Sequence, residues 1–86
     1  MNDSIDFIDV ELYTERLNDM YARIAEFVAA YPGNKLVPKL KEQQQTLAIA
    51  HHKSRFYRDK EHFAIWDDLL QQSERLLTEA QAANTL

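Results

Sequence analysis

The stretch Tyr31-Pro32-Gly33-Asn34-Lys35-Leu36-Val37-Pro38 decides how this chain folds, because it holds the single glycine and both prolines of the 86 residues. A residue that precedes proline is pushed out of the helical region, and glycine readily takes a left-handed turn conformation. We therefore predict that a first helix ends before Pro32, after which Gly33 can take a left-handed turn conformation. Asn34 or Pro38 can then open a second helix, which we expect to start between residues 34 and 38.

The arm before this stretch carries apolar side chains at alternating spacings of three and four residues. This spacing places them on one stripe of an amphipathic helix, which we predict from residue 8 to residue 31. Asp6 and Asp9 are its candidate caps. Leu12, Tyr21 and Val28 widen the apolar face, so that more than one neighbouring helix is expected. The stripe consists of Val10, Tyr13, Leu17, Met20, Ile24, Phe27 and Tyr31.

The arm after Pro38 contains no glycine or proline, and helix-forming residues dominate it. Two apolar seams run through this arm. The weaker seam, which polar Gln43 and Ser54 interrupt, consists of Leu36, Leu40, Leu47, Ala50 and Tyr57. The stronger seam repeats every seven residues and consists of Ile49, Phe56, Phe63, Leu70 and Leu77, with Trp66, Leu69, Leu76 and Ala80 beside it. We predict a turn near Asp59 that separates helices at residues 37–58 and 61–82.

These patterns predict one all-α domain over residues 1–86, with frayed ends at residues 1–6 and 83–86. We favour a small antiparallel three-helix bundle, because a chain this short needs its third helix to fold back to bury a core. The alternative is a helical hairpin with one long second helix of roughly 70 Å. That helix would dimerise, since it would expose Phe63, Trp66, Leu70 and Leu77.

Charge is segregated along the chain. Residues 1–34 carry −5, residues 35–60 carry +5 and residues 61–86 carry −4, which sum to the net charge of −4. We favour pairing of the basic middle with the acidic helices on either side, each exposed ion pair contributing about 1 kcal/mol or less. The alternative is an exposed patch for an anionic partner, formed by Lys53, Arg55, Arg58 and Lys60.

Composition and motifs argue against several functional classes. The chain has no cysteine, no signal peptide and no apolar run of about 18 residues, so we expect a cytoplasmic protein that does not enter a membrane. His51 and His52 are adjacent and diverge by about 100° on a helix, which predicts no metal site. Asp67 and Asp68 are expected to form a solvated face. We predict no cofactor and no catalytic activity, because one glycine leaves little of the backbone geometry that phosphate loops and oxyanion holes need.

The sequence therefore predicts a small non-catalytic interaction module of bacterial or phage type, such as an adaptor, an inhibitor or a regulatory subunit. It would bind a protein partner through a helical face, and its acidic flanks would steer it toward a basic partner. A homodimer follows from the long-helix alternative. The candidate partner-contact residues are Tyr21, Trp66, Leu69 and Leu76.

The alternative function is nucleic-acid binding through the basic segment Lys53–His62. In this segment Arg55 is followed by six residues and then His62. This spacing resembles the Arg-x(4–6)-His motif of the HEPN ribonucleases, which are all-helical, over two residues of a permissive pattern. The resemblance implies that His62 would act in acid–base chemistry on a ribose 2′-hydroxyl and that Arg55 would hold the phosphate.

Overall fold

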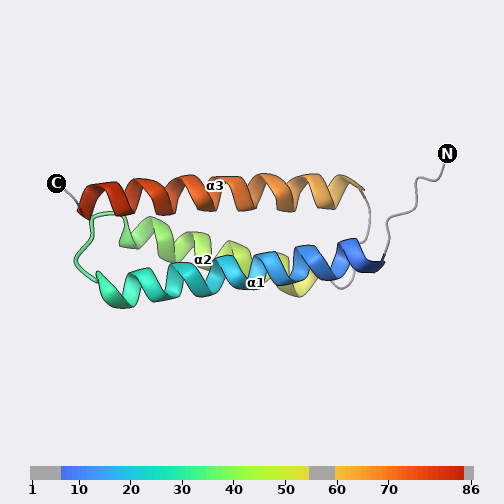
Figure 1. Ribbon diagram of the computed structural model, residues 1–86, viewed down its shortest axis with the longest axis horizontal. Helices are drawn as coiled ribbons and strands as arrows, with labels where there is room; N and C mark the ends of the chain where they lie inside the picture. Colours follow the sequence, from blue (N-terminus) through green and yellow to red (C-terminus); the bar gives the residue numbers. More distant parts are fainter. Residues whose placement is uncertain (1–6, 55–59, 85–86) are drawn as a thin grey trace.

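The computed structural model describes residues 7–54 and 60–84 of the chain. This part of the chain forms the helices α1 (Phe7–Ala30), α2 (Val37–Lys53) and α3 (Lys60–Asn84). Each helix contacts the other two, so the protein is a small all-α three-helix bundle, as predicted. Figure 1 shows that α2 runs opposite to α1 and α3, which therefore point the same way.

The alternative of one long second helix is wrong. The side-chain amide of Gln43 on α2 donates a hydrogen bond of 2.7 Å to the hydroxyl of Ser73 on α3. In one continuous helix these two residues would lie about 45 Å apart. The chain therefore folds back after α2, which ends at Lys53 rather than at the predicted residue 58. Asp59, where we predicted the turn, lies outside the described residues.

The boundaries of the first two helices agree closely with the sequence prediction. The backbone N–H of Tyr31 still donates to the carbonyl of Phe27 at 2.8 Å, and α1 ends at Ala30, immediately before the residue that precedes Pro32. At its start, α1 already includes Asp9 within its first turn, so Asp9 is not a cap, and Asp6 lies outside the described residues. α2 begins at Val37, inside the predicted window, with proline in its first turn.

The turn between α1 and α2 shows which backbone conformation Gly33 adopts. The N–H of Asn34 donates to the carbonyl of Tyr31 at 3.0 Å, which closes a turn over Pro32 and Gly33. No glycine in the described ranges has a positive φ, so Gly33 does not take the left-handed conformation that the sequence allowed. A type I turn requires no positive φ at either central position, which explains how the chain reverses here without one.

The core lies along the axis of the bundle and is built from the predicted α1 stripe. The side chain of Val10, the first residue of the stripe, lies outside those that the structure describes, Tyr13 is half-buried, and Tyr31 at the other end is exposed. Between them the α1 side chains meet residues from both other helices, which is why the stripe needed to be wide. The main core cluster consists of Leu17, Met20, Ile24, Phe27, Leu40, Leu47, Ala50, Trp66, Leu69, Leu77 and Ala80.

The seven-residue seam predicted across α2 and α3 is wrong on its α2 side. Ile49 is 56% exposed, whereas Leu77 is buried and Phe63 and Leu70 are half-buried. Phe56 of the same seam lies outside the described residues. Each helix takes its own rotation about its axis once the chain folds back, so a spacing that spans the junction carries no structural meaning. The weaker seam is the real core face of α2, since Leu40, Leu47 and Ala50 are buried.

Two buried serines explain the polar interruptions in that weaker seam. Ser54, directly after α2, donates from its hydroxyl to the His51 carbonyl at 2.7 Å, and a 2.8 Å hydrogen bond joins it to the hydroxyl of Thr14 on α1. Ser73 donates to the Leu69 carbonyl at 2.8 Å and accepts from Gln43. Each buried hydroxyl is therefore satisfied inside the bundle, as buried polar groups must be.

Candidate partner-binding groove

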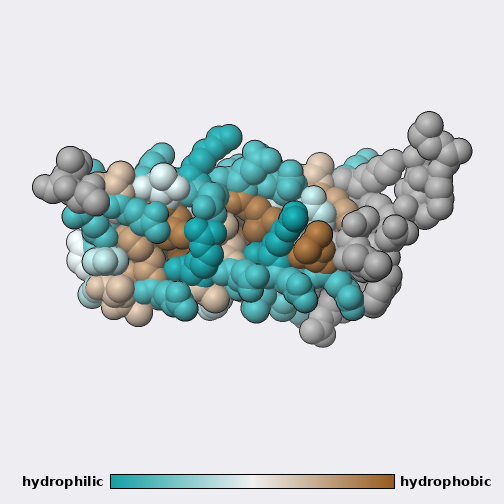
Figure 2. Space-filling model, in the orientation of Figure 1, coloured by the Kyte–Doolittle hydropathy of each residue, from teal (hydrophilic) through white to brown (hydrophobic). Residues whose placement is uncertain are grey.

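α1 and α3 lie side by side and leave a shallow groove on their shared outer face. Two hollows of about 300 Å³ and about 270 Å³ lie along it, the first near the middle of both helices and the second nearer their C-terminal ends. Figure 2 shows hydrophobic side chains between hydrophilic ones on the face that α1 and α3 present to the viewer in Figure 1. We call this feature the α1/α3 groove. Its lining residues are Arg16, Asp19, Met20, Arg23, Glu26, Phe27, Asp67, Leu70, Gln71, Glu74, Leu77 and Gln81.

The floor of the groove is apolar. Met20 and Leu70 line the first hollow, and Phe27 and Leu77 line the second. On each helix the two floor residues are seven positions apart, which returns a side chain to nearly the same face after two turns. Leu70 is half-buried and the other three are buried. A partner side chain would therefore reach the floor by passing between the side chains of the rim.

The rim of the groove is acidic. The lining residues include the carboxylates of Asp19, Glu26, Asp67 and Glu74 and the guanidinium groups of Arg16 and Arg23, four negative charges against two positive. The helices that form the groove are acidic as a whole. α1 carries five acidic and two basic residues, α3 carries the same numbers, and each helix therefore has a formal charge of −3.

An ion pair crosses the groove between its two hollows. The two guanidinium nitrogens of Arg23 donate to the two carboxylate oxygens of Glu74 at 2.7 and 3.1 Å. These hydrogen bonds lower the pKa of Glu74 and raise the pKa of Arg23, with partial burial opposing both shifts and charge attraction assisting them. The two side chains are 48% and 51% exposed, so they stand above the floor.

Asp67 also faces the groove, whereas the sequence predicted a solvated pair with Asp68. The Tyr13 hydroxyl donates to one carboxylate oxygen of Asp67 at 3.4 Å, and the Gln71 amide donates to the other at 3.3 Å. Asp67 is half-buried as a result, while Asp68 is exposed and accepts a hydrogen bond from Gln72. The α1 partner of Asp67 is 54 positions away in the chain, so no local sequence signal distinguishes the two aspartates.

Tyr21 is the predicted contact residue that the structure leaves accessible. It is 40% exposed and lines a hollow of about 200 Å³ between α1 and α2, together with Asn18, Leu47, Ala48 and His51. This hollow contains no residue of α3 and lies apart from the α1/α3 groove. Tyr21 therefore remains a candidate contact residue of a different face.

The structure corrects the prediction that Trp66 and Leu69 contact a partner, because these side chains are 3% and 8% exposed and belong to the core. Both side chains lie beside the stronger seam on α3 and face the core cluster. Leu76 is half-buried and packs against the core cluster. The structure therefore does not bring the four predicted residues together into one surface.

The predicted basic patch is described only in part. Lys53 is exposed at the end of α2, Arg55 and Arg58 lie outside the described residues, and Lys60 begins α3. Lys35, Lys39 and Lys41 are also exposed. The ion pair that the structure shows, Arg23–Glu74, uses none of these residues. In the described ranges, the pairing of basic and acidic helices that we favoured is therefore not seen for Lys35, Lys39, Lys41 or Lys53.

The three histidines belong to no metal-binding group in the described part of the chain. His62 is half-buried, with its ring centre 6.0 Å from that of Trp66, and Arg55, its partner in the ribonuclease resemblance, lies outside the described residues. His51 is half-buried and His52 is exposed. Within residues 7–54 and 60–84, no group of three acidic, histidine or cysteine side chains is placed to hold a metal ion.

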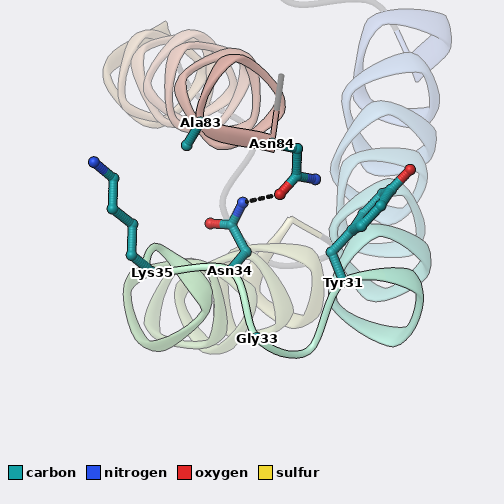
Figure 3. Close-up of a pocket in the computed structure, with 6 residues that line it drawn as sticks. All are labelled: Tyr31, Gly33, Asn34, Lys35, Ala83 and Asn84. Carbon is teal, nitrogen blue, oxygen red and sulfur yellow. Dashed lines mark hydrogen bonds between the residues drawn. The ribbon is translucent and has the colours of Figure 1, made fainter. Parts of the chain in front are cut away.

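A further hollow of about 480 Å³ lies at the end of the bundle, where the α1–α2 loop meets the end of α3. Figure 3 shows Asn34 at its centre, with Lys35 and Tyr31 on opposite sides. The Asn34 side-chain amide donates to the Ala80 carbonyl at 2.9 Å and to the Asn84 side chain at 2.7 Å, and its oxygen accepts from the Leu36 N–H. Asn34 is therefore occupied in joining the loop to α3, although the sequence suggested it only as a cap.

The bonds of Asn34 also explain the end of α3. This helix continues through Asn84, two residues into the segment that we expected to fray.

None of the helices in the described part of the chain is long and apolar enough to span a membrane. Comparison of the chain with protein-family models, with curated proteins and with solved structures found no match.

Proposed function

We propose that this protein is a small non-catalytic interaction module that binds a basic segment of a partner protein in the α1/α3 groove. The observation that carries this proposal is the combination of an apolar floor with a rim of four carboxylates and two guanidinium groups. Apolar anchors provide affinity in such interfaces, and charge complementarity selects the partner and speeds encounter. Adaptor, inhibitor and regulatory-subunit roles all use a surface of this kind.

A photo-cross-linking amino acid at Gln71 tests the proposal directly. Gln71 lines the groove and is exposed, so its replacement leaves the core intact. The matched control is Gln45, which is exposed on α2 and lies outside the groove. In cells that make the protein, we expect a discrete protein adduct from position 71 and not from position 45. Equal adducts from both positions, or none from position 71, would overturn the proposal.

The second candidate function is binding of a nucleic acid through α2. The observation that favours it is that Lys35, Lys39, Lys41 and Lys53 are exposed and take no part in the ion pair of the structure. Lysines that neutralise phosphates release counterions, so binding would weaken steeply between about 50 and 200 mM salt. A labelled single-stranded RNA that binds in this way, and is lost with Lys39→Glu and Lys41→Glu, would establish this candidate. Cleavage of that RNA, abolished by His62→Ala, would establish the ribonuclease alternative.

A further inference from the structure

We propose that the partner segment is an amphipathic α-helix that docks in the α1/α3 groove as a fourth helix of the bundle. Two apolar side chains seven residues apart would sit on either side of the Arg23–Glu74 ion pair, with a small residue between them. This inference rests on the proposed function and adds the conformation and side-chain spacing of the bound segment.

The spacing of the groove floor favours a helix over an extended peptide. The floor pairs Met20–Leu70 and Phe27–Leu77 are separated by seven residues on each helix, which is about 10.5 Å. A docked helix presents side chains at positions i and i+7 with the same separation. An extended strand presents side chains on one face at multiples of about 6.7 Å, which does not match.

The ion pair restricts the middle of the docked helix. Arg23 lines both hollows, so the pair separates one apolar site from the other. The bidentate geometry holds both side chains in place, and both are about half exposed above the floor. A large side chain midway between the two anchors would collide with this pair, whereas alanine, glycine or serine would pass over it.

The charges on the rim indicate which residues the flanks of the docked helix carry. Asp19 and Glu26 on α1 and Asp67 on α3 would face lysine or arginine on the two sides of the partner helix. A second copy of this chain is a poorer occupant, because its two longer helices, α1 and α3, each carry a formal charge of −3 and would bring like charges to the acidic rim. On its α2, the exposed Ile49 has Glu42 seven residues before it, and Phe56, seven residues after it, lies outside the described residues.

Designed peptides test the inference. The probe is a helical peptide of about 20 residues, long enough to form an isolated helix, with two leucines seven apart, alanine midway and lysines on both flanks. One control places the leucines five apart, about 140° around the helix, and another replaces lysine by glutamate. We expect fluorescence anisotropy to show binding of the probe at least about tenfold tighter than of either control. Amide shifts should concentrate around Met20, Phe27, Leu70 and Leu77.

Charge reversal on the protein supplies a matched comparison. Asp19→Lys with Glu26→Lys should weaken binding of the probe about tenfold at low ionic strength, because two attractions become repulsions. Glu42→Lys with Glu79→Lys changes the net charge equally at exposed sites outside the groove and should leave binding unchanged. Equal effects of the two variants, or amide shifts centred on α2, would overturn the inference.

The role of the ion pair has its own test. A second peptide carries leucine in place of the midway alanine, and the native protein should bind it about tenfold more weakly. The variant Arg23→Ala with Glu74→Ala should lose this preference, whereas Lys39→Ala with Glu42→Ala should keep it. A native protein that binds both peptides equally would show that the pair does not restrict the middle of the groove.

The two proposals fail in distinguishable ways. If the peptides do not bind but position 71 still yields a discrete protein adduct, the helical form is wrong and the groove remains the binding site. If both tests fail, the proposed function is wrong. Sedimentation velocity measures the oligomeric state. A native protein that forms a dimer, which the double variant Asp19→Lys with Glu26→Lys no longer forms, would assign the groove to a second copy and overturn the inference.

Discussion

At the scale of single residues, Ser73 shows how a hydroxyl is accommodated in the core of a small bundle. The side chain is completely buried, donates to the Leu69 carbonyl and accepts from the Gln43 amide. Replacing a hydrogen-bonded group by alanine leaves its partner unsatisfied, whereas replacing both partners by apolar groups can be nearly neutral. The pair therefore lets polar Gln43 sit at the α2–α3 contact.

We expect Ser73→Ala to lower the free energy of unfolding by about 1 to 2 kcal/mol, because the Gln43 amide loses its acceptor in a partly buried position. Combining Ser73→Ala with Gln43→Leu should recover most of this loss. Urea denaturation of the two single variants and the double variant measures the coupling. Strict additivity of the two changes would mean that the hydrogen bond contributes nothing to stability.

Gly33, also at the scale of single residues, has a backbone conformation that a residue with a side chain can adopt. Its φ is not positive, and a Cβ added there would meet no atom within 4 Å. We expect Gly33→Ala to raise the free energy of unfolding by about 0.4 to 1 kcal/mol, because alanine has fewer unfolded conformations. Thermal unfolding measures this change. A decrease in stability would indicate that the turn needs a left-handed residue after all.

Burial of single residues on α1 could be predicted from the sequence, whereas the contacts of the groove residues could not. The alternating spacing of three and four was enough to predict the burial of Leu17, Met20, Ile24 and Phe27 on α1, because burial follows the helical period. The groove residues Arg23, Asp67 and Glu74 carried no comparable signal. Their contacts join positions more than 50 residues apart in the chain, so their meeting depends on how α1 and α3 are rotated and aligned.

At the scale of the helices, the Asn34 side chain joins the α1–α2 loop to the end of α3 through two hydrogen bonds, to Ala80 and Asn84, and accepts a third from the Leu36 N–H within the loop. We expect Asn34→Ala to lower the free energy of unfolding by about 1 to 2 kcal/mol, since a turn and an interhelical contact are lost together. Hydrogen exchange should become faster at residues 80–84 and remain unchanged near the middle of α3. Faster exchange along the whole of α3 would mean that the contact supports the entire helix.

The Arg23–Glu74 ion pair links α1 to α3 and predicts a pH dependence. Because the pKa of Glu74 is lowered in the folded protein, the pair stabilises the fold above the ordinary carboxyl value of 4.5, and this contribution disappears as the pH falls through the lowered pKa. Since both side chains are about half exposed, we expect a contribution below about 1 kcal/mol.

The comparison of native protein with Glu74→Gln measures this contribution. The two proteins should differ in stability at neutral pH and converge in acid, below the lowered pKa of Glu74. Glu79→Gln on the same helix provides the control, because Glu79 is exposed and makes none of the contacts described for Glu74. A difference that persists unchanged into strong acid would exclude the ion pair as its cause.

The junction between α2 and α3 marks the limit of sequence prediction at this scale. The existence of two helices could be inferred from length, because one long helix would leave half its apolar residues uncovered. The relative rotation of the two helices could not be inferred, since a repeat of seven continues across any junction in the sequence whether or not the chain turns there. Ile49 was misplaced for this reason.

At the scale of the whole molecule, stability depends on which α2 residues reach the core. We expect Leu47→Ala to lower the free energy of unfolding by about 2.5 to 5 kcal/mol, because Leu47 is completely buried and a cavity would remain. Ile49→Ala should change it by less than about 0.5 kcal/mol, since Ile49 is more than half exposed. Chemical denaturation of both variants tests the rotation of α2. Equal losses would show that Ile49 also reaches the core.

The distribution of charge over the whole molecule was visible in the sequence, but its spatial meaning was not. α1 and α3 each carry −3, whereas α2 carries three basic residues and one acidic residue, a charge of +2. Folding brings every pair of helices into contact, and acidic side chains of α1 and α3 line the groove between these two helices. Which charged side chains meet at such a groove depends on the packing of the helices and cannot be read from a charge count.

The burial of Trp66 has a practical consequence for spectroscopy. It is the single tryptophan of the chain, it packs 5.3 Å from the ring centre of Phe63, and it lines neither hollow of the α1/α3 groove. Its emission therefore responds to loss of the core and not to occupancy of the groove. Intrinsic fluorescence can therefore follow the folding of every variant discussed above, while a dye on the peptide follows docking in the same sample.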